Sequence, residues 1–247
     1  MTKRRNQPVI HPPVVWVTGA SRGIGREIAI QFASIGCNVC LSSRNVRRLD
    51  QIVAEIKKMG GNAHTFPVDI ARPQSIDRVV NRISTQIGKI DILVNNAGMT
   101  VFKSFLSTSL EEFQTIIATN LYGHIACIKA VLPSMVKDRS GWIFNIISNA
   151  AVKTFEGSSA YTATKAGMLG VGRVLREEMR RHQIRVVNII PGATETEMWK
   201  PVMRKQFGRR MMRPQSVAET VLAVYQMPDD LVVDEILFRP IQGDISV

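Results

Sequence analysis

The sequence predicts an α/β fold: a doubly wound parallel sheet of seven strands with helices on both faces. Short apolar runs rich in β-branched residues alternate along the chain with longer segments of helical periodicity. Several runs, among them VVWV and IFNII, are apolar on both sides of a strand, which is typical of a parallel sheet covered by helices on both faces. The alternation indicates βαβ units with right-handed crossovers.

The expected elements can be placed along the chain from these patterns. Strands are expected at residues 14–18, 39–43, 64–68, 90–95, 142–148, 185–190 and 235–239, and helices at 24–35, 45–59, 74–87, 110–136, 159–182 and 215–226. Ligands of such folds bind at the carboxyl ends of the strands. Motifs that directly follow a strand are therefore the first candidates for function.

Length and composition indicate one domain with a large core. The chain has 247 residues, 45% of them hydrophobic and 21% charged, which argues against disorder. We expect a single domain over residues 14–247, preceded by a loose, basic and proline-rich leader over 1–13 without the apolar segment of a secretory signal. No apolar run approaches the roughly 18 residues of a membrane-spanning helix, so we expect a cytoplasmic protein without membrane contact.

The chain has three cysteines, Cys37, Cys40 and Cys127, which favours a reducing compartment over a disulfide framework. Cys37 and Cys40 form a C-x-x-C pair that could serve redox or metal chemistry. No second pair and no suitably spaced histidines follow, and residues three apart in a strand point to opposite faces. We therefore expect these cysteines to pack in the core, and we expect no metal site.

A glycine-rich turn follows the first expected strand and leads into a helix. It reads TGASRGIG over residues 18–25, with the spacing G-x-x-x-G-x-G rather than the common dinucleotide pattern G-x-G-x-x-G. Glycines bring backbone N–H groups close to a pyrophosphate, and the helix N-terminus adds partial positive charge. An ordinary glycine turn is the alternative, but the position between strand and amphipathic helix favours phosphate binding. The expected cofactor contacts are Gly19, Ser21, Arg22, Gly23, Ile24 and Gly25.

The end of the second expected strand indicates which nicotinamide cofactor is preferred. An NAD site would carry an acidic residue there to accept a hydrogen bond from the ribose 2′-hydroxyl, but this segment has Ser43 and Arg44 and no acid. Arg44 can pair with a 2′-phosphate, and Arg22 can add a second cation. Both arginines could instead be solvated at the surface. Together with the lack of an acid, they favour NADP(H).

Tyr161 and Lys165 lie four residues apart on an expected helix and therefore share one face. A tyrosine is mostly protonated at neutral pH, and a nearby ammonium lowers its pKa, which suits a general acid or base. Ser148 ends the fifth expected strand, where its hydroxyl could bond a substrate oxygen or cap the strand end. Alone, a Y-x-x-x-K pair often means surface packing.

Six motifs follow one another between residues 14 and 198: Thr18-Gly19-x-x-x-Gly23-x-Gly25, Asn95-Asn96-Ala97-Gly98, Asn120, Ser148, Tyr161-x-x-x-Lys165 and Pro191-Gly192. In this order and spacing the sequence resembles the short-chain dehydrogenase/reductase family. The resemblance implies a single-domain Rossmann fold, hydride transfer between nicotinamide and a carbonyl or alcohol, and a catalytic tetrad of Asn120, Ser148, Tyr161 and Lys165.

The resemblance also implies a role for each matching residue. Tyr161 protonates the carbonyl oxygen as hydride arrives, or removes that proton in reverse, while Lys165 lowers the tyrosine pKa and holds the nicotinamide ribose. Ser148 polarises the carbonyl, and Asn120 holds a water between Lys165 and solvent unless it only marks a helix bend. Further cofactor contacts are implied for Asp69 (otherwise a helix cap), Ile70, Asn95, Asn96, Ala97, Gly98, Ile190, Pro191, Gly192, Thr194 and Thr196.

Two segments depart from many members of that family. Residues 229–240 (DDLVVDEILFRP) replace the T-G-x-x-x-x-V-D-G-G ending of many tetrameric members and look more like the branch that acts on small hydroxy acids and aldehydes. A substrate lid is expected over about 197–213, and within it residues 198–213 contain six basic residues, no acid, and interleaved aromatic and methionine residues. This lid suits an anionic substrate with an apolar part, or it is a solvated, mobile basic helix. A homodimer on the two longest helices, or a homotetramer, is expected.

The sequence thus predicts an NADP(H)-dependent reductase of a ketone, aldehyde or 3-oxoacyl thioester. A thioester suits the basic lid, whereas a small hydroxy acid or aldehyde suits the ending. The net charge of +12 also permits a nucleic acid or an anionic surface as partner, but no nucleic-acid motif or aromatic–basic platform accompanies it, so no nucleic-acid partner is expected. A non-catalytic NADP(H)-sensing or nucleic-acid-binding protein is the alternative from another class.

Overall fold

Seven strands form one sheet in which all neighbouring strands are parallel. They are β1 (Val14–Thr18), β2 (Asn38–Ser42), β3 (Asn62–Thr65), β4 (Ile92–Asn95), β5 (Gly141–Ile146), β6 (Ile184–Pro191) and β7 (Glu235–Phe238), in the order β3-β2-β1-β4-β5-β6-β7. The computed structural model describes residues 11–245, so most of the expected leader over 1–13 lies outside the described residues. The predicted fold class is confirmed.

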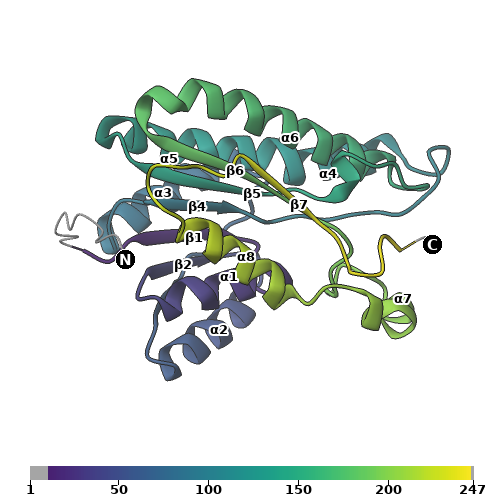
Figure 1. Ribbon diagram of the computed structural model, residues 1–247, viewed down its shortest axis with the longest axis horizontal. Helices are drawn as coiled ribbons and strands as arrows, with labels where there is room; N and C mark the ends of the chain where they lie inside the picture. Colours follow the sequence, from purple (N-terminus) through teal and green to yellow (C-terminus); the bar gives the residue numbers. More distant parts are fainter. Residues whose placement is uncertain (1–10, 246–247) are drawn as a thin grey trace.

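Helices cover both faces of the sheet (Figure 1). On one face lie α1 (Gly23–Ser34), α2 (Val46–Lys58) and α8 (Pro214–Tyr225), and on the other lie α3 (Pro73–Gln86), α5 (Gly123–Asp138) and α6 (Ser159–Met179). The short helix α4 (Leu110–Ile117) begins at a capping box formed by Ser109 and Glu112. Prolines stand in the first turn of α3, α8 and α7 (Pro201–Phe207), where a missing N–H costs no hydrogen bond.

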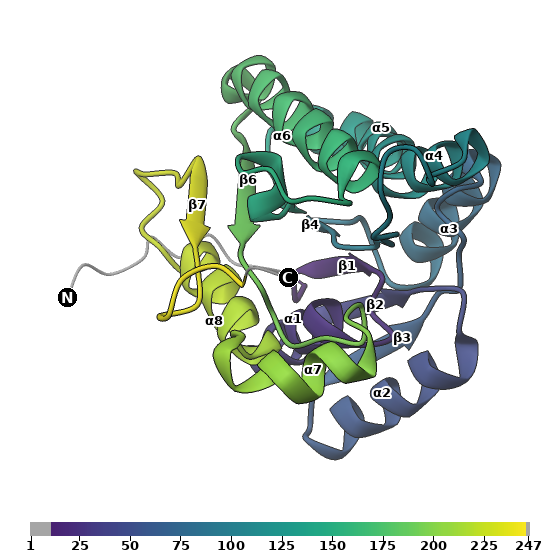
Figure 2. The same ribbon diagram turned by 90° about the vertical axis from the view of Figure 1, so that its right-hand side faces the viewer.

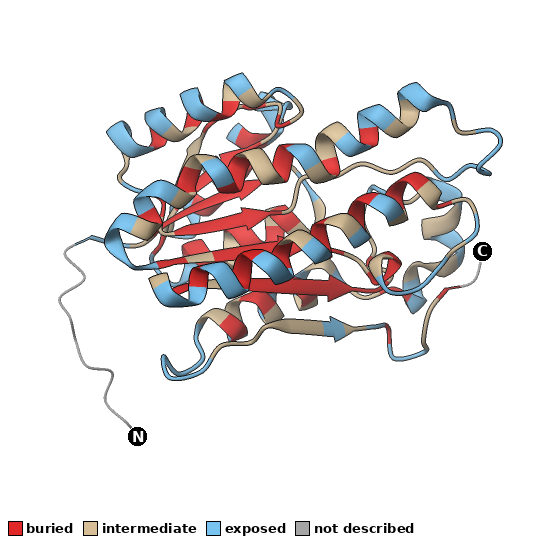
Figure 3. Ribbon diagram, turned by 90° about the horizontal axis from the view of Figure 1, so that it is seen from above, coloured by how far each residue is buried: buried red, intermediate tan, exposed pale blue. Residues whose placement is uncertain are grey.

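Both faces of the sheet are buried at its central strands, whereas the edge strand β7 is only partly covered (Figure 3). Trp16 and Cys40 pack under α3, α5 and α6, whereas Val15, Val17 and Cys37 pack under α1, α2 and α8. The two cysteines of the C-x-x-C pair therefore lie on opposite sides of the sheet as free, buried residues. Their predicted core position is confirmed.

The strand order reverses between β1 and β4, and this reversal positions the site. From β1 the chain proceeds through β2 to β3 in one direction across the sheet, and from β4 it proceeds through β5 and β6 to β7 in the other. This divergence leaves a crevice at the carboxyl ends of β1 and β4. Figure 2 looks onto that end of the sheet, with α7 in front of it. The segment after β6, expected as the lid, thus returns across the crevice.

The segment expected as one helix over 110–136 is interrupted by a π-helical stretch, η1 (Ala118–Tyr122), between α4 and α5. The whole run, Leu110–Asp138, is long and apolar enough to cross a membrane, with a mean hydropathy of 1.3 in its most apolar window. The expectation that no such segment exists was therefore wrong. Here, however, α5 packs against the sheet and α3, as a core helix of this fold does.

Several element boundaries differ from the expected ones, and two of the differences lie close to the crevice. β3 ends at Thr65 rather than at residue 68, although the N–H groups of Phe66 and Val68 still donate to the carbonyl oxygens of Leu41 and Ser43, at 2.9 and 3.3 Å. β5 ends at Ile146, two residues before Ser148, which instead caps a short 3₁₀ turn over Asn149–Ala151. The expected lid contains α7 and a 3₁₀ turn over Gly208–Arg210.

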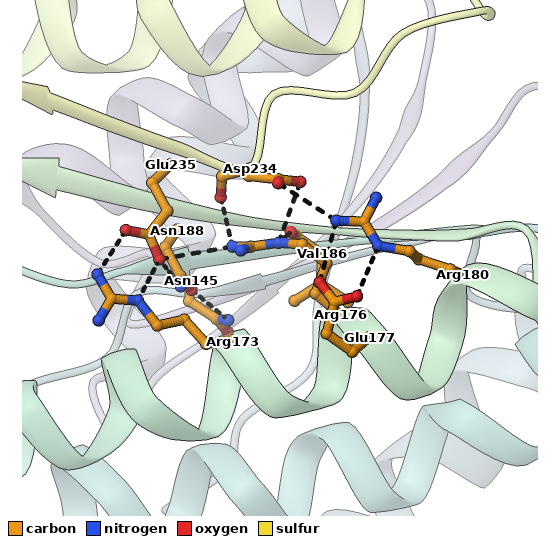
Figure 4. A network of polar contacts seen from close by, with 9 residues as sticks. All are labelled: Asn145, Arg173, Arg176, Glu177, Arg180, Val186, Asn188, Asp234 and Glu235. Atoms are coloured by element: carbon orange, nitrogen blue, oxygen red, sulfur yellow. Dashed lines mark hydrogen bonds and ion pairs between the residues drawn. The ribbon is translucent and has the colours of Figure 1, made fainter.

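Polar contacts, those of Arg176 buried and those of Arg173 exposed, tie α6 to β6 and β7 (Figure 4). Arg176 donates from Nε to the carbonyl oxygen of Val186 at 2.9 Å and from Nη2 to that of Asp234 at 2.5 Å. One turn earlier, Arg173 binds both carboxylate oxygens of Glu235 at 2.8 Å. These contacts hold the C-terminal half of α6 against the sheet, whereas its first turns lie beside the crevice.

A row of buried amides continues this network into the sheet. Asn95, Asn145 and Asn188 occupy paired positions on β4, β5 and β6 and are joined by hydrogen bonds of 3.0 and 3.1 Å. Asn188 then donates to Glu235 at 3.2 Å. Each of these fully buried amides thereby satisfies part of the hydrogen-bonding need of its neighbour.

Candidate active site

A cavity of ≈ 780 Å³ lies at the carboxyl ends of the strands, where the order reverses. It brings together most of the residues that the sequence singled out: Gly19, Ser21, Arg22, Gly23, Ile24, Ser43, Arg44, Asp69, Ile70, Asn96, Ala97, Gly98, Ser148, Tyr161, Lys165, Pro191, Gly192, Thr194 and Thr196. Among residues 11–245, its lining does not include Gly25, Asn95, Asn120 or Ile190.

The glycine turn forms one wall of the cavity. Gly19 and Gly23 have φ values of +66° and +56°, which favour glycine, and a Cβ on Gly19 would lie 2.6 Å from the Cα of Ala97. Gly25 serves packing instead, because a Cβ there would lie 2.3 Å from the side-chain nitrogen of Asn96. Asn96 itself donates from Nδ2 to the carbonyl oxygens of Thr18 and Gly19, at 3.0 and 3.2 Å.

The N-terminus of α1 opens into the same cavity. Arg22 is its N-cap residue, no described side chain caps the helix there, and its first turn carries no acid. The first N–H groups of the helix, together with its partial positive charge, are thus available to an anion.

Cations gather where β2 ends. Ser43 and Arg44 line the cavity as expected, and so does Arg48 in the first turn of α2. Arg48 was not among the predicted site residues, although its position in the first turn of the helix that follows β2 could have indicated it. Arg22 and Arg48 both form ion pairs with Glu197, at 2.9 and 2.8 Å.

Asp69 lines the cavity after β3, and its Oδ1 accepts a hydrogen bond from the backbone N–H of Ala71 at 3.2 Å. The N-cap residue of α3 is Arg72, so Asp69 forms a turn and does not cap the helix.

Tyr161, Ser148 and Lys165 meet at the other end of the cavity. Tyr161 and Lys165 lie in the first two turns of α6 and are both buried, and a side-chain hydrogen bond joins Tyr161 to Ser148. The ammonium of Lys165 donates to the carbonyl oxygen of Ile146 at 2.8 Å. A hydroxyl pair and a cation are thereby held beside the space that a ligand would fill.

The electrostatics of this group differ from the expectation. Burial raises the pKa of Tyr161, and the hydrogen bond from Ser148 opposes this rise only in part. Burial also lowers the pKa of Lys165 to about 8. The expected lowering of the tyrosine pKa by Lys165 is not seen, because the ammonium lies 5.7 Å from the ring centre and is bonded to Ile146.

Asn120 and Asn95 are held inside the protein, away from the cavity. In η1, the amide of Asn120 accepts from the N–H of Met99 at 2.9 Å and donates to the carbonyl oxygen of Met99 at 2.8 Å and to Thr164 at 3.3 Å. Asn120 thus pins the segment after β4 to α6, and its position in a π-helical stretch agrees with the helix-bend interpretation. Asn95, expected on the cofactor side of its strand, lies fully buried in the amide row.

Aromatic side chains line the cavity beyond Tyr161. Phe102 and Trp199 stack with ring centroids 6.0 Å apart and an interplanar angle of 23°. Phe155 adds a third ring, and the buried carboxylate of Asp244 pairs with Lys153 at 2.8 Å. The sequence analysis placed Trp199 in the lid but missed Phe102, Phe155 and Asp244, which come together only in the folded chain.

The residues present fit a nicotinamide dinucleotide. A glycine cradle that any Cβ would fill and an uncapped helix N-terminus suit a pyrophosphate. Cations lie at one end of a continuous cavity and the Tyr161–Lys165 pair lies at the other.

The order of the strands, the glycine turn after β1 and the crevice at the strand ends define a Rossmann-type α/β protein. A model of the short chain dehydrogenase family matches residues 13–206, and the chain belongs to the short-chain dehydrogenase/reductase family of oxidoreductases. This confirms the resemblance.

Relatives and solved structures agree with this assignment. A sepiapterin reductase of Chlorobaculum tepidum is 35% identical over 240 residues, covering 94% of this chain and 98% of the relative. A 3-oxoacyl-[acyl-carrier-protein] reductase of Synechocystis sp. is 34% identical over 214 residues, covering 84% and 87%. The crystal structure of a metagenomic short-chain oxidoreductase in complex with NADP is similar with a TM-score of 0.83 at 32% identity, covering 93% of this chain and 97% of the other.

Proposed function

We propose that the protein is an NADP(H)-dependent reductase of carbonyl compounds. The observation that carries this proposal is one cavity with Tyr161, hydrogen-bonded to Ser148, at one end and a cluster of arginines at the other. The spacing suits a cofactor that is held by its phosphates at the arginine end and presents its reactive ring near the tyrosine.

The catalytic roles follow from the chemistry of the side chains. When bound, the cofactor supplies the hydride. Tyr161 gives its proton to the carbonyl oxygen, and its raised pKa keeps it protonated for this step. Ser148 donates a hydrogen bond that orients the same oxygen. Lys165 would hold the nicotinamide ribose through its ammonium group, which lies beside the cavity.

Preference for NADP(H) is supported by the residues after β2. No acid is present to accept from a ribose 2′-hydroxyl, and Arg44 and Arg22 line the cavity there. The metagenomic oxidoreductase with a similar fold binds NADP. Both observations favour a 2′-phosphate.

For the substrate, we propose a carbonyl compound with a planar apolar part. The stacked rings of Phe102 and Trp199 offer faces to such a group. A relative is named sepiapterin reductase, and others are named 3-oxoacyl-[acyl-carrier-protein] reductases. A thioester is favoured instead by the basic lid, so both classes belong in the test.

We further propose a cytoplasmic homo-oligomer. Apolar side chains of Phe105, Leu106 and Leu110 are exposed where α4 begins, as expected of an interface. Sedimentation of the full chain at micromolar concentration would test this.

The test of the proposed function is NADPH oxidation with sepiapterin, a 3-oxoacyl thioester and a small aldehyde. Tyr161→Phe should lower kcat about 100- to 10,000-fold on the best substrate. Binding of NADPH, followed by calorimetry, should stay unchanged. Equal turnover by Tyr161→Phe would refute the proposed mechanism. Tight nucleic-acid binding near physiological salt without NADPH oxidation would favour the non-catalytic alternative.

A further inference from the structure

Glu197 joins two sides of the cavity mouth. Its Oε2 accepts a hydrogen bond from Nη1 of Arg48 at 2.8 Å and another from Nη1 of Arg22 at 2.9 Å. Arg22 lies in the turn after β1, Arg48 in the first turn of α2, and Glu197 in the loop after β6, and all three line the cavity. Two guanidinium groups from separate elements therefore meet at one oxygen position.

That position is suited to an oxyanion. Converging guanidinium groups bind carboxylate and phosphate alike, and a phosphate monoester brings more charge and three acceptor oxygens. Arg44 lines the same cavity and makes no ion pair with any residue between 11 and 245. The hydrogen bonds from Arg48 and Arg22 lower the pKa of Glu197, so its carboxylate is ionised at neutral pH.

We propose that Glu197 competes with the 2′-phosphate of NADP(H) for Arg22 and Arg48 and thereby limits the preference of the protein for NADP(H) over NAD(H). The inference rests on the proposed function, because it concerns the same cofactor site. To bind, NADP(H) must displace the carboxylate or accept a neighbour of like charge, and either event weakens binding. NAD(H) has no 2′-phosphate and leaves both ion pairs in place.

The ion pairs are weak enough to be exchanged. Their side chains are between 42 and 50% exposed, and ion pairs at such positions contribute little to stability. Removal of the Glu197 charge should therefore leave the fold intact and act on the cofactor alone.

The test is calorimetric titration of the full chain with NADPH and NADH, in wild type and in Glu197→Gln. The variant should bind NADPH about three- to tenfold more tightly, and NADH within about twofold of wild type. The fragment 2′,5′-ADP should also bind the variant more tightly than wild type, whereas 5′-ADP should bind both proteins equally. This pair of results would assign the gain in affinity to the 2′-phosphate.

Glu195→Gln is the matched control. Glu195 lies two residues away, pairs with Arg204 at 3.7 Å, and is not part of the cavity lining among the described residues. This variant should bind both cofactors as wild type does.

Two results for Glu197→Gln would overturn the inference. An unchanged NADPH-to-NADH ratio would show that Glu197 does not compete with the phosphate. Weaker binding of both cofactors would show that the ion pairs hold the cavity mouth closed over any dinucleotide. Equal affinity of the wild type for NADPH and NADH would instead refute the proposed NADP(H) preference. A clear preference of the wild type for NADPH, together with the same ratio of the two affinities in the variant, would refute only the role of Glu197.

Discussion

The ammonium nitrogen of Lys165 lies 5.7 Å from the centre of the Tyr161 ring, and both side chains are buried. Burial acts on the two groups in opposite senses, because it disfavours charge on either. It raises the pKa of Tyr161 and lowers that of Lys165 to about 8. The pair is therefore held with a protonated phenol and a lysine whose charge is easily lost above neutral pH.

The free energy of unfolding should depend on pH through the buried ammonium group of Lys165. Between about pH 8 and pH 10.5, the unfolded chain holds a proton at this lysine that the folded chain has lost, so this group makes the free energy of unfolding rise with pH. The free energy of unfolding of wild type minus that of Lys165→Met should therefore grow by about 2 kcal/mol from pH 7 to pH 10. Urea denaturation at several pH values measures it.

Other titrating groups cancel in that difference. Burial raises the pKa of the three thiols, so their contributions to stability fall as pH rises, but equally in both proteins. A difference between wild type and Lys165→Met that stays constant with pH would mean that Lys165 keeps its ordinary pKa in the folded protein.

Cofactor preference should depend on Arg44. Replacement by alanine removes a charge-assisted donor to the 2′-phosphate, so Arg44→Ala should bind NADPH about 10- to 100-fold more weakly and NADH as before. Arg47→Ala is the control, because Arg47 is also exposed in the same stretch of chain but does not line the cavity among residues 11–245. Fluorescence titration of wild type and both variants with each cofactor gives the six dissociation constants. Equal losses for both cofactors would show that Arg44 does not distinguish them.

The sequence predicted those parts of the site that follow a strand directly. Gly19, Arg44 and Ser148 each lie one or two residues after the end of a strand, and the carboxyl ends of parallel strands meet at one edge of the sheet. Short apolar runs rich in β-branched residues locate the strands, so these positions could be inferred without knowing any long-range contact. Tyr161 and Lys165 were found because helical periodicity places them on one face.

The rest depends on contacts between distant segments. Glu197 and Arg48 are 149 residues apart in sequence, and no local pattern indicates that they meet. Phe102 and Trp199 come together only because the lid returns across the crevice. Asn95 was misplaced for a similar reason: its amide pairs with Asn145 on the neighbouring strand, and only the register of β4 and β5 shows this.

Substrate choice should depend on Trp199. Loss of an aromatic stacking partner costs about 0.5–1.5 kcal/mol, so Trp199→Ala should raise KM for sepiapterin about two- to tenfold and leave KM for a small aldehyde unchanged. Phe105→Ala is the control, since Phe105 is exposed and packs against Phe113 rather than lining the cavity in the described part of the chain. A similar rise in KM for both substrates would instead indicate that Trp199 shapes the lid as a whole.

Attachment of α6 to the sheet should depend on Arg176 far more than on Arg180. The Arg176 side chain is 7% exposed, and its loss removes the side-chain donor to the carbonyl oxygen of Val186 and one of the two donors to that of Asp234. Arg176→Met should therefore lower the free energy of unfolding by about 2–4 kcal/mol. Arg180 is 47% exposed and pairs with Glu177 and Asp234, so Arg180→Met should cost at most about 1 kcal/mol. Urea denaturation at pH 7 compares the two variants, and equal losses would mean that the buried contacts of Arg176 contribute no more than a surface ion pair.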